Sequence, residues 1–104
     1  MHDAAPPSAS DKPEVLRRQA TALLTAGEAR QALRLAVQGL AHFPDDARLC
    51  NLAGECAAAL GDLAQAETHW RRALAIAPHS ARVNFNLGLL YAQGQRIAEA
   101  EQCY

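Results

Sequence analysis

A spacing of 34 residues recurs along this chain of 104 residues. Among the residues that repeat with this spacing are Pro44 and Pro78, Gly27 and Gly61, Gly54 and Gly88, and Ala32, Ala66 and Ala100. Periods of roughly 20 to 50 residues are typical of stacked supersecondary units, because one unit cannot bury its apolar face alone. The chain is therefore expected to fold as an array of units at 13–46, 47–80 and an incomplete 81–104.

Each unit is expected to contain two antiparallel helices. The segments are rich in alanine, leucine, arginine and glutamate, which favour helices. No stretch of several residues shows the alternation of apolar and polar residues that is expected for a strand. Gly27 and Gly61 are expected at the turns between paired helices, and Asp62 and Ser80 are expected to cap the helices that follow them. The helices are predicted at 13–26, 29–42, 46–60, 63–77, 81–93 and 97–104.

Gly54 and Gly88 fall inside predicted helices. Glycine costs about 1 kcal/mol relative to alanine at such positions, so its repetition indicates close approach between the two helices of a pair. The small residues Ala32, Ala66 and Ala100 are expected to face these glycines.

The repeated residues resemble the tetratricopeptide repeat, in which Leu-Gly and an aromatic residue precede alanine, a second aromatic residue and a closing proline. The residues that carry this resemblance are Leu87, Gly88 and Tyr91, Ala66 and Trp70, Ala100 and Tyr104, and the prolines Pro44 and Pro78. The first unit departs from the pattern, since Gln19 and Ala20 stand where Leu-Gly is expected. The resemblance covers 13–104 and implies an all-α, right-handed solenoid of antiparallel helix pairs, about two and a half units long.

Charge and composition indicate which partners and which cellular compartment this chain is expected to have. Ten basic and eleven acidic residues give a net charge of −1, so no strong field favours nucleic acid or an anionic membrane. No apolar run approaches the roughly 20 residues that span a bilayer. Residues 1–12 lack the features of a secretory signal, and their Pro, Ala and Ser content predicts a disordered lead-in. These features favour a cytoplasmic protein, and the arginine- and alanine-rich composition is associated with bacterial genomes.

The sequence predicts no metal or cofactor. Three cysteines make an odd count, which does not indicate a disulfide framework. A metal site would have to combine Cys50 or Cys56 with His42, His69 or His79, and no Cys-x-x-Cys or His-x-x-x-His spacing supports one. Small buried thiols are the simpler interpretation.

Catalytic motifs are also missing. The pairs Asp45–Asp46 and Glu99/Glu101 are more simply explained as residues at a helix start and on a solvated helix face than as catalytic carboxylates. The sequence contains no nucleophile elbow and no Gly-rich phosphate loop. Trp70 is expected to pack between repeats rather than to bind a ligand. The chain is therefore not expected to be an enzyme by itself.

The resemblance implies a concave groove formed by the first helices of successive units. Its lining is expected to be Arg17, Thr21, Leu24, Asn51, Glu55, Ala58, Arg82, Phe85, Leu89 and Gln93. Arg17 and Arg82 would take a carboxylate, Asn51 would pair with a peptide backbone, and Phe85 and Leu89 would seat an apolar group.

Chaperone-binding members of the family hold a carboxylate in a clamp of Lys, Asn and Arg. The five clamp positions are Arg17, Thr21, Leu52, Arg82 and Asn86 here. Arg17 and Arg82 stand at basic positions of the clamp, but Thr21, Leu52 and Asn86 do not match the residues expected at the other three, and Leu52 cannot donate the required hydrogen bond. Binding of a chaperone tail is therefore not predicted.

Three functional hypotheses remain. The first is a non-catalytic module that binds a peptide or helix of a partner protein in the groove. The second is an N-terminal docking or regulatory segment of a larger enzyme, such as a glycosyltransferase or hydroxylase. The third is a self-assembling unit, since Leu87, Leu90 and Tyr91 are expected at an uncapped C-terminal end that a second copy could cover as a homodimer. The favoured explanation of the uncapped C-terminal end is that this chain is a fragment of a longer protein.

Overall fold

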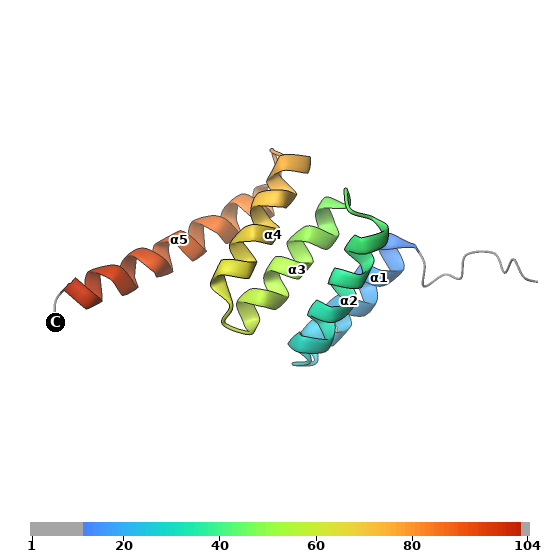
Figure 1. Cartoon of the computed structure of the whole chain (residues 1–104), viewed down its shortest axis with the longest axis horizontal. Coiled ribbons are helices and arrows are strands. Elements are labelled where there is room, and N and C mark those ends of the chain that lie inside the picture. Colours follow the sequence, from blue (N-terminus) through green and yellow to red (C-terminus); the bar gives the residue numbers. More distant parts are fainter. Residues whose placement is uncertain (1–11, 103–104) are drawn as a thin grey trace, which may run out of the picture.

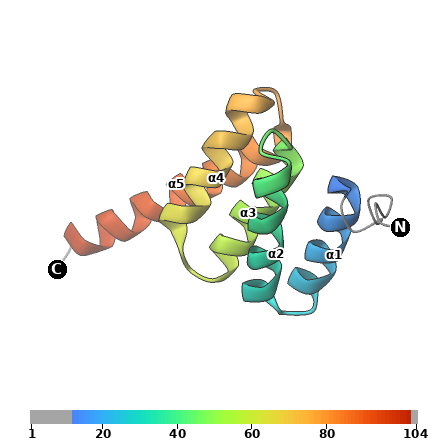
Figure 2. The same ribbon diagram turned by 45° about the vertical axis from the view of Figure 1, so that its right-hand side comes forward.

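The computed structural model describes residues 12–102, and the side chains of residues 12–95. Its elements are the helices α1 (Pro13–Thr25), α2 (Ala29–His42), α3 (Ala47–Ala59), α4 (Leu63–Ile76) and α5 (Ala81–Gln102). Within this part of the chain there is no strand, and no helix is long and apolar enough to cross a membrane. Helices α1 to α4 lie side by side, and the C-terminal part of α5 extends beyond them (Figures 1 and 2). The prediction of an all-α helical repeat is confirmed.

The chain reverses direction at two glycines, at the positions where the sequence predicts turns between paired helices. Gly27 and Gly61 have φ angles of 86° and 82°, which L side chains rarely adopt, and they follow α1 and α3. The caps are also confirmed: the Asp62 carboxylate accepts from the Gln65 amide at 3.1 Å. The first four helices lie within one residue of their predicted bounds at each end.

The prediction of two helices at 81–93 and 97–104 is wrong within the described residues, because α5 is a single helix from Ala81 to Gln102. The cause is that the residues that make the turn after α3 are not repeated one period later, after the first half of α5. One period after Gly61 stands Gln95, and one period after the Asp62 cap stands Arg96, which carries no acceptor. Gly94 comes one position early and has no positive φ. The helix therefore continues through the expected turn.

The core lies between α1–α4 and the first half of α5. Its main cluster consists of Leu16, Ala36, Leu40, Leu49, Cys50, Ala53, Ala57, Ala66, Trp70, Ala73, Val83, Leu87 and Leu90. The small residues among them allow the helices to approach closely, and the leucines and Trp70 supply most of the buried apolar surface. The core thus fixes the relative positions of α1, α3 and α5.

The expected contacts of the intrahelical glycines are corrected in part. A side-chain carbon at Gly54 would overlap the indole ring of Trp70, so the nearest neighbour of Gly54 is Trp70 rather than Ala66. Gly88 has no such neighbour within 4 Å of a side-chain carbon. The side chain of Ala100, its expected partner, lies outside the described residues, as does almost all of the expected lead-in at 1–12.

Candidate functional site

A groove of about 580 Å³ lies between α1, α3 and the start of α5. Of the residues expected to line it, the structure brings together Arg17, Thr21, Asn51, Glu55 and Arg82. The groove is also lined by Leu52, one of the clamp positions considered above, and by residues that sequence reasoning missed: Ala47, Arg48, Ala77, Ser80 and Val83. The link between α4 and α5 thus forms one end of the groove.

The remaining expected residues lie elsewhere. Leu24 and Ala58 are half-buried and pack against the two core clusters. Phe85 and Leu89 are 65% and 50% exposed and stand one helical turn apart on α5. Gln93, one further turn along, is exposed. Because Phe85 and Leu89 follow Arg82 at spacings of three and seven, they continue its side of α5 as an apolar ledge beyond the groove.

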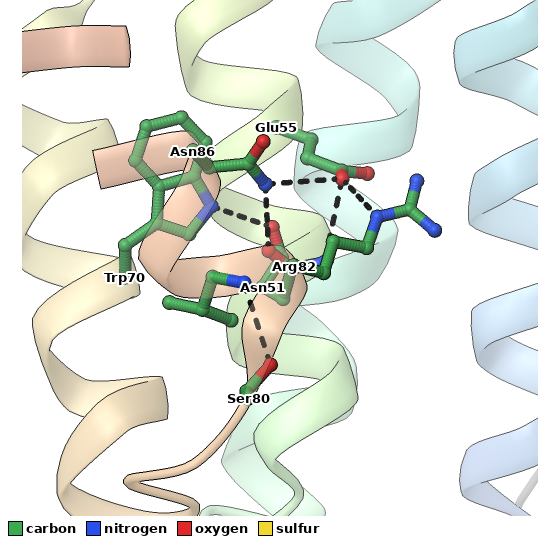
Figure 3. A network of polar contacts seen from close by, with 7 residues as sticks. Asn51, Glu55, Trp70, Ser80, Arg82 and Asn86 are labelled. Carbon is green, nitrogen blue, oxygen red and sulfur yellow. Dashed lines mark hydrogen bonds and ion pairs between the residues drawn. The ribbon is translucent and has the colours of Figure 1, made fainter. Parts of the chain in front are cut away.

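A network of polar side chains joins α3 to α5 across the groove wall (Figure 3). The Glu55 carboxylate accepts hydrogen bonds from Arg82 Nε at 2.9 Å, Asn51 Nδ2 at 3.3 Å and Asn86 Nδ2 at 3.4 Å. Asn86 Nδ2 also donates to Asn51 Oδ1 at 3.1 Å. The network therefore holds the side chains of the wall in fixed positions before any ligand arrives.

Arg17 is held by a second carboxylate. Its Nη1 lies 2.8 Å from Asp46 Oδ2, and the two side chains are only 21% and 16% exposed. Asp46 Oδ1 also accepts from the Leu49 amide at 2.9 Å and so caps α3. Asp46 thus ties α1 to the start of α3, and Arg17 is already paired inside the protein.

The charge of the lining is positive, with Arg17, Arg48 and Arg82 against Glu55. Arg48 is exposed, and among the described residues no hydrogen bond or ion pair engages it. The signal that could have found it is the 34-residue period, which places Arg48 and Arg82 at the same position of successive units. Arg82 is bonded to Glu55, but its side chain is 73% exposed and its two terminal nitrogens remain accessible. An anionic group would be attracted to these two arginines.

The buried titratable groups do not add a reactive centre. Burial raises the pKa of the Cys56 thiol to about 11 and also raises the pKa of Cys50, so both stay protonated at neutral pH. Burial lowers the pKa of His69, which favours its neutral form. Among residues 12–95, no three His, Cys, Asp or Glu side chains are grouped to hold a metal ion.

Comparison with known proteins gives one family. A model of the tetratricopeptide repeat matches residues 17–81 and, in an overlapping second match, residues 59–104. The chain is also 34% identical over 74 residues to a protein O-mannosyl-transferase of Caenorhabditis elegans. That match covers 71% of this chain and 11% of the relative. Repeats of this family generally form protein-interaction modules with no catalytic role of their own.

Proposed function

The chain belongs to the tetratricopeptide repeat family, and we propose that its groove binds a peptide or helix of a partner protein without catalysing a reaction. The observation that carries this proposal is the positively charged groove between α1, α3 and α5, bordered by the apolar ledge of Phe85 and Leu89. These features suit a segment with a carboxylate next to an apolar side chain.

The internal ion pairs decide which arginines a partner would use. Arg17 is largely buried against Asp46, so releasing it would leave a carboxylate unpaired. Arg48 carries no such cost, and Arg82 offers its terminal nitrogens while Nε stays on Glu55. We therefore expect Arg48 and Arg82 to hold the carboxylate and Arg17 to hold the fold.

The proposal is tested by selecting peptides from a displayed library and measuring their affinity by fluorescence anisotropy. We expect the selected peptides to contain Asp or Glu beside an apolar residue. Arg48→Glu should weaken them at least about tenfold, because an attraction becomes a repulsion. Arg82→Ala and Phe85→Ala should each weaken them as well.

Arg34→Glu is the matched control, since Arg34 is exposed on α2 and does not line the groove. It makes the same change in net charge and should leave the affinity within about twofold. Equal losses from Arg34→Glu and Arg48→Glu would mean that only overall charge matters, and the proposed groove would be wrong.

The similarity to a protein O-mannosyl-transferase favours a second candidate, in which this chain is a docking segment of a larger enzyme. The groove would then hold the protein that the enzyme modifies. Peptides with Ser or Thr near the carboxylate, and with weaker binding once that hydroxyl carries mannose, would support docking. Equal binding of both forms would favour a free-standing module. A cytoplasmic location and a bacterial source remain predictions.

A further inference from the structure

The same helix face is covered in the second repeat and uncovered in the third. On α3 this face consists of Cys50, Gly54 and Ala57, which are all buried. One period later it consists of Asn84, Gly88 and Tyr91, which are all exposed. The difference arises because α4 packs against α3 in an antiparallel pair. Among the described residues, α4 reaches this face of α5 only at its edge, through the Tyr91 hydroxyl, and leaves the space at Gly88 open.

Trp70 shows what such a face accepts. Its indole ring fills the space left by the missing side chain of Gly54, and Trp70 Nε1 donates to the Asn51 carbonyl at 3.1 Å. At Gly88 the corresponding space is empty to 4 Å. Tyr91, which is 45% exposed, borders this space, and its hydroxyl accepts a hydrogen bond from Arg71 at 2.8 Å and donates one to Glu67 at 3.1 Å. The surface is thus shaped and fixed before anything covers it.

The sequence contains the matching helix. Residues 97–104 repeat the residue types of the first half of α4: Ile97 for Leu63, Ala98 for Ala64, Ala100 for Ala66 and Tyr104 for Trp70. In α4, Ala66 and Trp70 are buried against the core. The segment therefore carries the pattern that the exposed face of α5 requires.

This segment does not reach its own face while α5 is continuous. In one straight helix, residues 88 and 100 are about 18 Å apart along the axis. Bending the chain back would require a turn near position 95, where Gln95 and Arg96 have replaced the glycine and the capping aspartate of the preceding unit.

We propose that residues 97–104 of a second copy of this chain cover the Asn84, Gly88 and Tyr91 face, and that the two copies exchange these segments reciprocally. Two α5 helices then run antiparallel in the register that pairs Gly54 with Trp70 within one unit. Because position 88 faces position 104, a twofold axis passes near residue 96. Each copy gives its segment and receives one, as a closed symmetric dimer requires.

This proposal is independent of the groove. Arg82 and Leu89 lie on a different side of α5 from Gly88, whereas Phe85, three residues before Gly88, borders the face that the second copy covers. Peptide binding through Arg48 and Arg82 and dimerisation through Gly88 therefore use different residues. A failure of either leaves the other intact. Continuation of the repeats by further chain, or a fold-back of the same copy, would instead leave this chain monomeric.

The test is light-scattering mass of the 104-residue chain over a hundredfold range of concentration. We expect a mass that rises from 11.1 kDa towards twice that value. Gly88→Ala should lower the association constant at least about tenfold, because the added carbon enters the space of the incoming aromatic ring twice per dimer. A monomer at every concentration would overturn the proposal.

Gly94→Ala is the matched control on the same helix. At neither glycine does an atom lie within 4 Å of an added side-chain carbon, so both substitutions should change the stability of the monomer to the same extent. In the exchanged register position 94 corresponds to Leu60, a larger residue that is 40% exposed, and an added carbon therefore fits. Gly94→Ala should leave the dimer as strong or stronger, and equal weakening by both variants would overturn the exchange.

A second variant restores the turn. Gln95→Gly combined with Arg96→Asp reinstates the signals that follow α3, so the segment should fold back on its own α5. We expect this variant to be a folded monomer at concentrations where the natural chain is a dimer. A double variant that dimerises as strongly as the natural chain would show that another surface holds the two copies.

Discussion

The indole ring of Trp70 lies against Gly54 so closely that no side-chain carbon fits between them. Trp70 is 5% exposed, and its Nε1 donates to the Asn51 carbonyl, which places the ring beneath the polar network of the groove. The packing of α4 on α3 and the arrangement of the groove wall therefore depend on the same contact. Glycine at position 54 is required by this contact, although it disfavours the helix.

Gly54→Ala should consequently destabilise the protein, even though alanine is the better helix former. Displacing a packed ring typically costs about 1–3 kcal/mol, which outweighs the gain of about 1 kcal/mol in helix propensity. We expect a lower urea midpoint with an unchanged slope, measured by circular dichroism. Gly88→Ala, measured at dilution, has no ring to displace and should raise the midpoint. A Gly54→Ala variant as stable as the natural chain would contradict this account of the glycine.

Asp46 should stabilise the fold through two separable interactions. Asp46→Ala removes the cap of α3 and the ion pair with Arg17, and we expect a loss of about 1–2 kcal/mol in unfolding free energy. Asp46→Asn keeps an oxygen for the Leu49 amide and loses only the charge, so its loss should be smaller.

A double-mutant cycle of Asp46→Asn with Arg17→Gln isolates the ion pair. The two losses should be less than additive, because each substitution removes the same pairing. Fully additive losses would mean that the 2.8 Å contact contributes no stability.

The sequence predicted the first four helices because their ends carry local signals, namely Gly27, Gly61 and Asp62. It failed at α5 because the overall repeat pattern outweighed the local residues Gln95 and Arg96, which do not support a turn. The charges around the groove were harder to predict. Arg17 and Arg82 were expected to bind a ligand carboxylate, and the structure pairs them with Asp46 and Glu55 of the protein itself. These pairings depend on how neighbouring helices pack together, which the sequence of a single repeat does not reveal.

The stability of the protein should fall in alkali because of Cys56. Burial raises the pKa of its thiol from 9.0 to about 11, so the unfolded chain releases this proton at lower pH than the folded one. The contribution is therefore present below pH 9 and is lost progressively between pH 9 and about pH 11.

The measurement is the unfolding free energy at pH 8 to 11. In the Cys56→Ala variant, the unfolding free energy should fall less between pH 8 and pH 11 than it does in the natural chain. The cavity left by the substitution lowers the stability of this variant at every pH, so each protein is compared with its own value at pH 8. An undiminished decline in this variant would assign the alkaline loss to other groups.

Glu55→Gln should strengthen binding of an acidic peptide. Among the described residues that line the groove, Glu55 is the one that is acidic, and its carboxylate accepts a hydrogen bond from Nε of Arg82. Glutamine keeps an acceptor for Asn86 but removes the negative charge, so Arg82 is released to the ligand. Because exposed charge interactions contribute about 0.5–1 kcal/mol, we expect affinity to rise roughly two- to fivefold, with a steeper dependence on salt.

Glu67→Gln is the matched control for this change. Glu67 is also bonded to an arginine, at 2.7 Å from Arg71 Nε, but it lies outside the groove lining. The two variants have equal net charge, so any difference between them reports where the charge was removed. Anisotropy titrations at low and high salt should show tighter binding only for Glu55→Gln. If Glu67→Gln tightens binding equally, the acidic peptide responds to net charge alone and the groove is not its site.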